Sequence, residues 1–209
     1  MHCITELPAW ERLLKRIVWK QLGSIQNKDI LDFGSGEGIT ANYFAQNNHV
    51  VAVEPSESML RNRWSDHPYR QICADVNCLT EFSDNTFDVV ICHNVLEYID
   101  DKEKVVNELC RVLKPGGLLS VVKHNRAGRV MQMAVLLDDF VKANELLDGH
   151  DGMSVQYGAI QYYDAKLTQW AKELKCTNNY GIRTFWDLQQ NQHSNKKQAD
   201  RKTCLLSRI

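Results

Sequence analysis

The stretch ILDFGSGEGIT, residues 30–40, decides the fold of this chain. Its apolar first part belongs to a predicted buried strand over residues 29–33, and its end opens a predicted helix over residues 38–46. Between them, glycines stand at every second position, at Gly34, Gly36 and Gly38. Glycines allow a tight turn and a close approach of the backbone to a ligand, and the following helix directs its first N–H groups toward that ligand. The stretch therefore predicts a ligand-binding turn between a strand and a helix.

Two acidic residues flank this turn. Asp32 lies at the end of the first strand, and Glu54 ends a second predicted strand over residues 50–54. A dinucleotide-binding turn uses similar parts, but its third glycine would fall at position 39, which is Ile39. A carboxylate beside the turn would repel a pyrophosphate but would suit a cation, such as the amino group or sulfonium of S-adenosylmethionine. Glu54 could accept hydrogen bonds from both ribose hydroxyls of such a nucleoside. The glycine spacing thus argues against a nicotinamide-dependent oxidoreductase.

Apolar runs and helical patterns alternate through the first half of the chain. Besides those above, strands are predicted over residues 70–74, 87–92 and 118–123, and helices over residues 56–64 and 101–113. Such alternation indicates a parallel sheet covered on both faces, and right-handed crossovers make it doubly wound. The predicted fold class is therefore α/β, a doubly wound, mostly parallel, Rossmann-like sheet. Ligands of such sheets bind at the carboxyl ends of the strands.

The two ends of the chain carry different patterns. The leading segment, residues 8–22, has helical periodicity and either packs on the edge of the domain or forms a lid over the ligand. Beyond Asn125, the following elements are predicted: a helix over 130–147, a loop over 149–158, a helix over 165–174 and a sixth strand over 177–183. We expect a single domain with three parts: a helical lid at 1–27, a binding core at 28–124 and an acceptor-side region at 125–209.

Further motifs stand in the order expected of one enzyme family. Asp75 follows the third strand, FDVVICHNVLEYI (87–99) contains the fourth, and RVLKPGGLL (111–119) precedes the fifth. Together with the glycine turn, this series resembles the class I S-adenosylmethionine-dependent methyltransferases with a methyltransferase type 11 domain. The resemblance covers about residues 28–124. It implies a strand order near 3-2-1-4-5-(7)-6, in which the last two strands form an antiparallel hairpin. Cys204 to Ile209 is the only candidate for the seventh strand, so we expect that strand to be missing or truncated.

The resemblance also implies roles for particular residues. The methionine part of the cofactor would contact the glycine turn, the ribose would contact the second strand, and the adenine would contact the third. The implied cofactor-binding residues are Asp32, Gly34, Ser35, Gly36, Gly38, Glu54, Pro55, Met59, Asp75, Val76 and His93. His93 and Asn94 would lie near the transferable methyl group. Met59 and Val76 could equally serve in packing, and His93 could simply bind backbone groups.

The acceptor is less well defined by the sequence. Segments 123–132 and 181–188, with HNVLEY and the leading helix, partly resemble bacterial tRNA 5-carboxymethoxyuridine methyltransferases. An ionised carboxylate acceptor needs a cation but no general base. Arg183 could supply the cation, His124 or Tyr157 could assist, and Trp186 could stack on a base. Arg183 could also be an ordinary surface arginine. A small-molecule carboxylate or hydroxyl acceptor fits the same residues, and a module that binds S-adenosylmethionine or S-adenosylhomocysteine without catalysis is the alternative of another class.

Composition narrows the class of protein further. The 209 residues carry a formal net charge of -1, so no global basic surface indicates nucleic acid. Seven cysteines without C-x-x-C spacing predict neither a disulfide framework nor a zinc site, and we expect no metal. No signal peptide or membrane span is expected, and reduced thiols favour a cytoplasmic protein. The expected partner is a methyl acceptor, either a small molecule or tRNA, and an unpaired sheet edge could be covered by a second copy in a homodimer.

Overall fold

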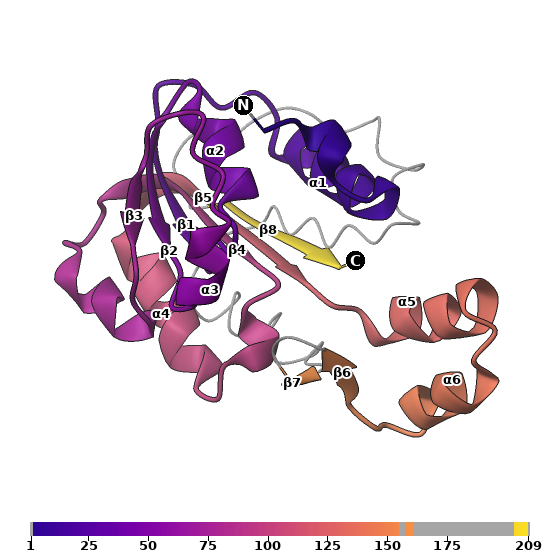
Figure 1. Ribbon diagram of the computed structural model, residues 1–209. Helices are drawn as coiled ribbons and strands as arrows, with labels where there is room; N and C mark the ends of the chain where they lie inside the picture. The colour runs from indigo at the N-terminus through magenta and orange to yellow at the C-terminus, as the bar shows by residue number, and fades with distance from the viewer. Residues whose placement is uncertain (1, 155–157, 161–202, 209) are drawn as a thin grey trace, which may run out of the picture.

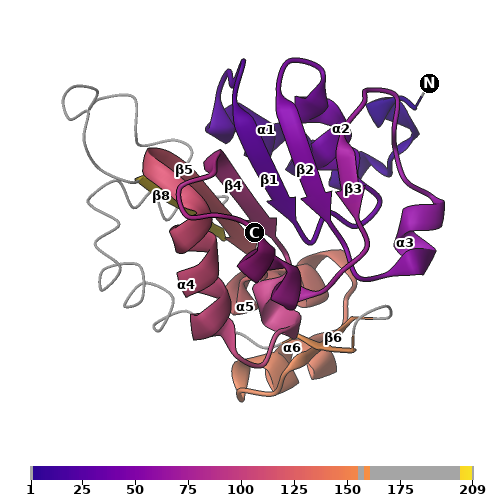
Figure 2. The ribbon, with the colours of Figure 1, turned by 90° about the vertical axis from the view of Figure 1, so that its left-hand side faces the viewer.

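The computed structural model describes residues 2–154, 158–160 and 203–208. Its centre is a six-stranded sheet in the order β3-β2-β1-β4-β5-β8, shown in Figures 1 and 2. The strands are β1 (Asp29–Phe33), β2 (His49–Val53), β3 (Arg70–Ile72), β4 (Phe87–His93), β5 (Leu113–Lys123) and β8 (Thr203–Arg208). All adjacent pairs run parallel. The predicted doubly wound sheet with the order 3-2-1-4-5 is confirmed.

Chain order reverses at β1, which pairs with β2 on one side and β4 on the other. Asp32 is the register partner of Ala52 in β2 and of Ile91 in β4. The chain therefore leaves β1 toward one half of the sheet and returns on its other side, which opens a crevice at the carboxyl ends of these strands. The glycine turn that follows Phe33 lies in this crevice.

Helices and short 3-10 turns cover both faces of the sheet. They are η1 (Ile4–Glu6), α1 (Ala9–Leu22), α2 (Ile39–Ala45), α3 (Glu57–Arg61), η2 (Val76–Glu81), η3 (Leu96–Tyr98) and α4 (Lys102–Val112). One core cluster joins α1 and α2 to the sheet through side chains such as Trp19 and Phe44. The opposite cluster joins α4 and η2 to the sheet through Leu109 and Leu79. Each face therefore has its own apolar layer, which accounts for the continuously apolar strands.

The fifth strand begins earlier than its composition suggests. We predicted a strand over residues 118–123, but β5 starts at Leu113 and passes through Pro115, Gly116 and Gly117. Its register with β4 shifts within this stretch: Phe87 pairs with Leu113, whereas Val89 pairs with Leu118. Pro115 lies in the unpaired residues between, where its lack of an N–H costs no hydrogen bond between the strands. The predicted start of this strand is therefore wrong, and α4 ends at Val112, three positions before Pro115.

The strand beside β5 also differs from expectation. β8 pairs with β5 in parallel register, from Leu118 with Thr203 to Lys123 with Arg208. We expected the seventh strand, with Cys204 to Ile209 as its only candidate, to be missing or truncated, and the sixth strand to flank β5. Instead, Thr203–Arg208 forms a strand, and it is this strand that pairs with β5, in parallel rather than as part of an antiparallel hairpin. The helix predicted over residues 165–174 and the strand predicted over 177–183 lie outside the described residues.

The segment after β5 folds into shorter elements than predicted. The helix expected over residues 130–147 is two helical pieces, α5 (Arg126–Met131) continuing into the π-helix η4 (Gln132–Leu136), and α6 (Phe140–Leu147). They separate because Asp138 takes a positive φ of 53° and Asp139 caps α6 by accepting a hydrogen bond from the Lys142 N–H. The loop predicted over 149–158 contains the strand β6 (Gly152–Ser154), which pairs antiparallel with β7 (Gly158–Ile160) at the end of that loop. Within the described residues, no helix is long and apolar enough to cross a membrane.

Candidate functional site

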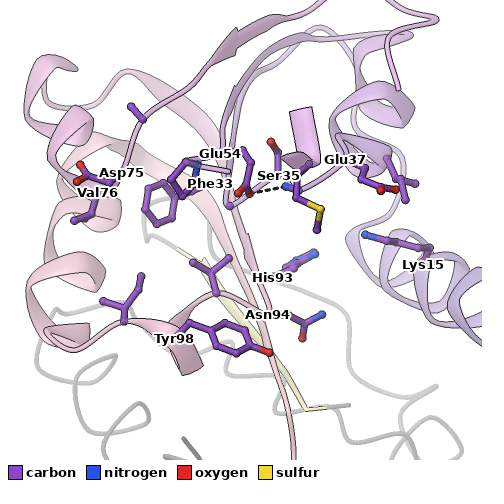
Figure 3. A pocket seen from close by; sticks show the side chains of 18 of the residues that line it. Lys15, Phe33, Ser35, Glu37, Glu54, Asp75, Val76, His93, Asn94 and Tyr98 are labelled. Carbon is purple, nitrogen blue, oxygen red and sulfur yellow. Dashed lines mark hydrogen bonds between the residues drawn. The ribbon is translucent and has the colours of Figure 1, made fainter. Parts of the chain in front are cut away.

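A cavity of about 630 Å³ lies at the carboxyl ends of β1, β2 and β4 (Figure 3). This is a common size for a site that takes a small molecule or a cofactor. Most of the predicted cofactor residues line it: Gly34, Ser35, Gly36, Glu54, Pro55, Met59, Asp75, Val76 and His93. Asn94, predicted on the catalytic side, lines it as well. The structure thus brings together residues that are up to sixty positions apart in the sequence.

The glycine turn takes a backbone shape that other residues adopt only with strain. Gly34 has a φ of 74°, and a Cβ added there would overlap the side chain of Val95, which lines the same cavity. Gly38 has a φ of 70° and begins α2, and a Cβ there would overlap the hydroxyl of Tyr69. Only glycine meets both demands, conformational and steric. The turn therefore packs tightly against the loop after β4 while its backbone stays open to the cavity.

Glu54 fastens this turn to the end of β2. Its side chain is buried, at 4% exposure, and its Oε2 accepts a hydrogen bond of 2.8 Å from the Gly36 N–H. Its Oε1 accepts one of 2.9 Å from the N–H of Ser56, which in turn caps α3. Bonds to an ionised carboxylate are stronger than neutral ones. Glu54 is therefore held rigidly where it meets the cavity, with further lone pairs left for a ligand.

Asp32 lies behind the glycine turn and does not line the cavity itself. It is 3% exposed, and its Oδ2 has no hydrogen-bond partner among the described residues. Burial raises the pKa of Asp32 to about 6, opposed by the positive charge of Lys15. A buried carboxylate oxygen without a donor is unusual and costs free energy. Such an orphaned acceptor suits a ligand that brings an ammonium group, as the methionine part of S-adenosylmethionine does.

Lys15 supplies a positive charge that the sequence analysis did not identify. It reaches the cavity from α1 (Figure 3). Its Nζ donates a 3.3 Å hydrogen bond to Oγ1 of Thr40 on α2. Burial lowers the pKa of Lys15, while the carboxylates of Asp32, Glu11 and Glu37 oppose that effect. Glu11, one helical turn before Lys15, also lines the cavity. The sequence of α1 does not distinguish Lys15 from the other basic residues of that helix. Only the packing of α1 against the sheet shows that Lys15 is the one that lines the cavity.

His93 and Asn94 lie at the end of β4, on the side of the cavity where Tyr98 also points inward (Figure 3). The ring Nε2 of His93 lies 2.9 Å from Ser120 Oγ. Burial, together with the charge of Lys15, lowers the pKa of His93 to about 3. The imidazole is therefore neutral at physiological pH and is a weak base. Asn94 takes a positive φ of 57°, and its N–H donates to the Val122 carbonyl at 2.7 Å.

Asp75 and Val76 form the opposite edge of the cavity, after β3. The Asp75 carboxylate is exposed and caps η2, accepting hydrogen bonds from the backbone N–H of Asn77 at 2.9 Å and from its side-chain amide at 3.2 Å. The cap fixes the direction of this carboxylate. A group that approaches from the cavity therefore meets an oriented acceptor beside the apolar side chain of Val76.

His124, like Asp32 and Gly38, is a predicted site residue that does not line the cavity. Its backbone N–H donates a 2.6 Å hydrogen bond to Oε1 of Glu97, which is 2% exposed. Burial lowers the pKa of His124. The suggestion that His124 assists the acceptor stays a prediction. Glu97 links the loops that follow β4 and β5 through this hydrogen bond. Arg183, Tyr157 and Trp186 lie outside the part of the chain that the structure describes.

Comparison with known proteins supplies the family. Residues 31–121 match the family described as "Methyltransferase domain". The chain is 25% identical over 202 residues to a tRNA 5-carboxymethoxyuridine methyltransferase of Escherichia coli K12, covering 88% of this chain and 76% of the relative. It is 27% identical over 156 residues to a ubiquinone biosynthesis O-methyltransferase of Coxiella burnetii, covering 71% of this chain and 63% of the relative.

Solved structures of methyltransferases have a similar fold. A SAM-dependent methyltransferase structure from Methanosarcina mazei superimposes with a TM-score of 0.54 at 20% identity, covering 75% of this chain and 83% of the other. At that identity the likeness shows the fold alone. The family match spans β1 through most of β5, and it includes the glycine turn, Glu54, Asp75 and His93. The chain thus carries a methyltransferase domain on the class I fold and is an S-adenosylmethionine-dependent methyltransferase.

Proposed function

We propose that this chain transfers a methyl group from S-adenosylmethionine to an oxygen of an ionised carboxylate acceptor. The observation that carries the cofactor half of the proposal is the pair of opposite charges beside the glycine turn. Lys15 lines the cavity from the facing helix, and Asp32 lies buried in β1 just before the turn, with one oxygen unpartnered among the described residues. A zwitterionic amino acid needs one anion and one cation, and both stand next to this turn.

The remaining lining residues fit the rest of the cofactor. Glu54 would hold the ribose hydroxyls, and Asp75 with Val76 would hold the adenine, since these residues lie in that order from the glycine turn outward. When bound, S-adenosylmethionine would supply an electrophilic methyl group: the acceptor lone pair would bond to the methyl carbon as the carbon–sulfur bond breaks, with S-adenosylhomocysteine as the leaving group. The protein contributes by aligning the two partners and by excluding water from between them. His93, Asn94 and Tyr98 would form the wall nearest that exchange.

The acceptor half of the proposal depends on the weakness of the bases at that wall. His93 has its pKa lowered to about 3, so it removes a proton poorly, and Asn94 cannot act as a base. An acceptor that is already ionised at neutral pH needs no proton removed. Carboxylates satisfy this condition. The similarity to a methyltransferase named for tRNA 5-carboxymethoxyuridine, which bears such a carboxylate, makes that nucleotide our first candidate. Arg183 stays the predicted cation for it.

A small-molecule acceptor is the second candidate. The formal net charge of -1 gives no general attraction to a polynucleotide, and the chain also resembles an O-methyltransferase of ubiquinone biosynthesis. A phenolic acceptor of that kind would need its proton removed. The two candidates therefore differ in the base they require as well as in size.

The deciding experiment supplies tritiated S-adenosylmethionine with two acceptor pools. One is bulk bacterial tRNA, briefly treated with mild alkali to free esterified carboxylates, and the other is a metabolite extract. We expect label in the tRNA that mild alkali releases again as volatile methanol, because methyl esters hydrolyse under conditions that N-methyl and ether groups survive. The Glu54→Gln variant should lose this activity, while Glu57→Gln, an exposed glutamate three residues away, should retain it. Alkali-stable label, or label confined to the metabolite pool, would contradict the tRNA carboxylate proposal.

A further inference from the structure

The helices after β5 form an arm that projects from the sheet (Figure 1). α5 and η4 lead outward, the turn at residues 137–139 lies at the free end, and α6 returns. Only a small core holds these helices to one another, namely Met133, Ala143 and Leu146, with Val130 and Ala134 partly buried beside them. At its base, Arg126 ties the arm together by donating hydrogen bonds to the carbonyls of Leu146 and His150.

The arm exposes many apolar side chains. Ten large hydrophobic residues are exposed in the described part of the chain, and seven of them lie here, between 53% and 73% exposed. They are Met131, Val135, Leu136, Leu137, Phe140, Val141 and Leu147. Together they present on the order of 700 Å² of surface, given side chains of about 150–200 Å² each. The largest apolar patch of a typical monomer is about 300–600 Å², so this surface is larger than a free face usually is.

α6 shows that this surface is organised. Ala143 and Leu146 are buried against the neighbouring helical piece. Phe140 and Leu147 are exposed and continue the apolar arc around the helix, and Val141 is exposed beyond Asn144, whereas the charges of Lys142 and Glu145 lie on the remaining sector. A helix with one neighbour needs only one apolar stripe. An arc that extends well past the buried pair is typical of a helix packed between two neighbours, as in a four-helix bundle.

We propose that the arm pairs with the arm of a second copy of this chain, so that two helical hairpins form a four-helix arrangement. The exposed apolar area is close to the roughly 800 Å² per partner that a standard stable interface buries. A nucleic acid is a poorer occupant, because over the whole arm, residues 126–148, Asp138, Asp139, Glu145 and Asp148 stand against Arg126, Arg129 and Lys142. The arm therefore has no excess of positive charge to hold a phosphate backbone or an anionic lipid surface.

The charges also favour an antiparallel two-fold pairing. Arg129 lies in the inner half of the arm, on α5, whereas Asp138 lies at the turn that forms its free end. A two-fold axis across the outer face would set the free end of one arm against the inner half of the other. Opposite charges would then meet at both ends of the interface, which fixes the register of the two hairpins.

The test is sedimentation velocity on the whole chain at concentrations from about 1 to about 100 µM, a range that covers weak and strong association. We expect a reversible monomer–dimer equilibrium. Phe140→Glu should weaken the association at least ~10-fold, since it replaces an exposed aromatic side chain of the apolar face with a charge. Leu13→Glu is the matched control. Leu13 is also a large hydrophobic residue that is exposed, at 43%, but it lies on α1 and not on the arm. It should leave the equilibrium unchanged, and circular dichroism melts should show that both variants fold.

A charge-reversal cycle tests the register. Arg129→Glu and Asp138→Lys should each weaken the dimer a few-fold, and the double variant should restore it, because the opposite charges then meet again. A chain that stays monomeric at the highest concentration would overturn the proposal. A dimer that Phe140→Glu leaves intact would do so as well, since the contact would then lie on another face. None of these measurements depends on methyl transfer, so their failure is separate from failure of the proposed function.

Discussion

The sharpest prediction from this structure concerns Glu54, which serves the fold and the ligand with the same carboxylate. Glu54→Gln keeps the shape of the side chain but leaves one acceptor oxygen instead of two. Its amide group would then face one of the two backbone N–H groups, of Gly36 or Ser56, that the carboxylate now binds at 2.8 and 2.9 Å. Hydrogen bonds to a charged group contribute about 1.5–3 kcal/mol each. We expect one to be lost within the protein and the bonds to the ribose hydroxyls to weaken similarly.

In binding, a loss of 1.5–3 kcal/mol corresponds to S-adenosylhomocysteine affinity lower by about 10- to 150-fold. Isothermal titration calorimetry of folded Glu54→Gln measures this directly. Glu57→Gln is the matched control, because Glu57 is an exposed glutamate on α3 that does not line the cavity. A dissociation constant within twofold of the unaltered protein for Glu54→Gln would refute the assigned role, and equal losses for both variants would show a general effect of charge instead.

Three further predictions address the other parts of the site. Because burial raises the pKa of Asp32 to about 6, the folded protein binds this proton more tightly than the unfolded chain does, so stability should fall as pH rises from about 4 to about 6. Asp32→Asn should abolish that fall in urea unfolding, stabilise the cofactor-free protein at pH 7 by on the order of 2–3 kcal/mol, and still weaken S-adenosylhomocysteine binding; an unaltered pH profile would contradict the assignment. Lys15→Met should weaken S-adenosylhomocysteine binding about 10-fold but not binding of methylthioadenosine, which lacks the amino-acid part, whereas Lys20→Met on the same helix should change neither. Gly34→Ala should destabilise the protein by about 2–4 kcal/mol in thermal unfolding and Gly116→Ala by about 1, because both glycines have a φ of 74° but only an alanine at 34 meets a side chain; equal losses would remove the steric argument.

Several features of this protein follow from local sequence, and the structure confirms them. We predicted the central strands from the apolar runs, from the breaks between them and from the glycines at every second position. These patterns succeed because strand formation depends here on neighbours within a few residues. β1 begins and ends where the pattern DILDF does. Ser56 caps α3 as expected, because a cap is a contact between residues three positions apart. Most of the predicted cofactor residues line one cavity for a similar reason, since parallel strands bring their carboxyl ends to one edge of the sheet.

Other features needed the folded chain, because they depend on contacts between distant segments. Lys15 joins the cavity only through the way α1 packs, and Glu97 meets the His124 N–H only because β4 and β5 are neighbours. The parallel pairing of β8 with β5 joins residues about eighty-five positions apart, where local periodicity carries no information on partner or direction. The sequence alone thus determined which chemistry the protein can hold, through its glycines and acids, and the tertiary structure decided which charges face that chemistry and which apolar surfaces are left uncovered.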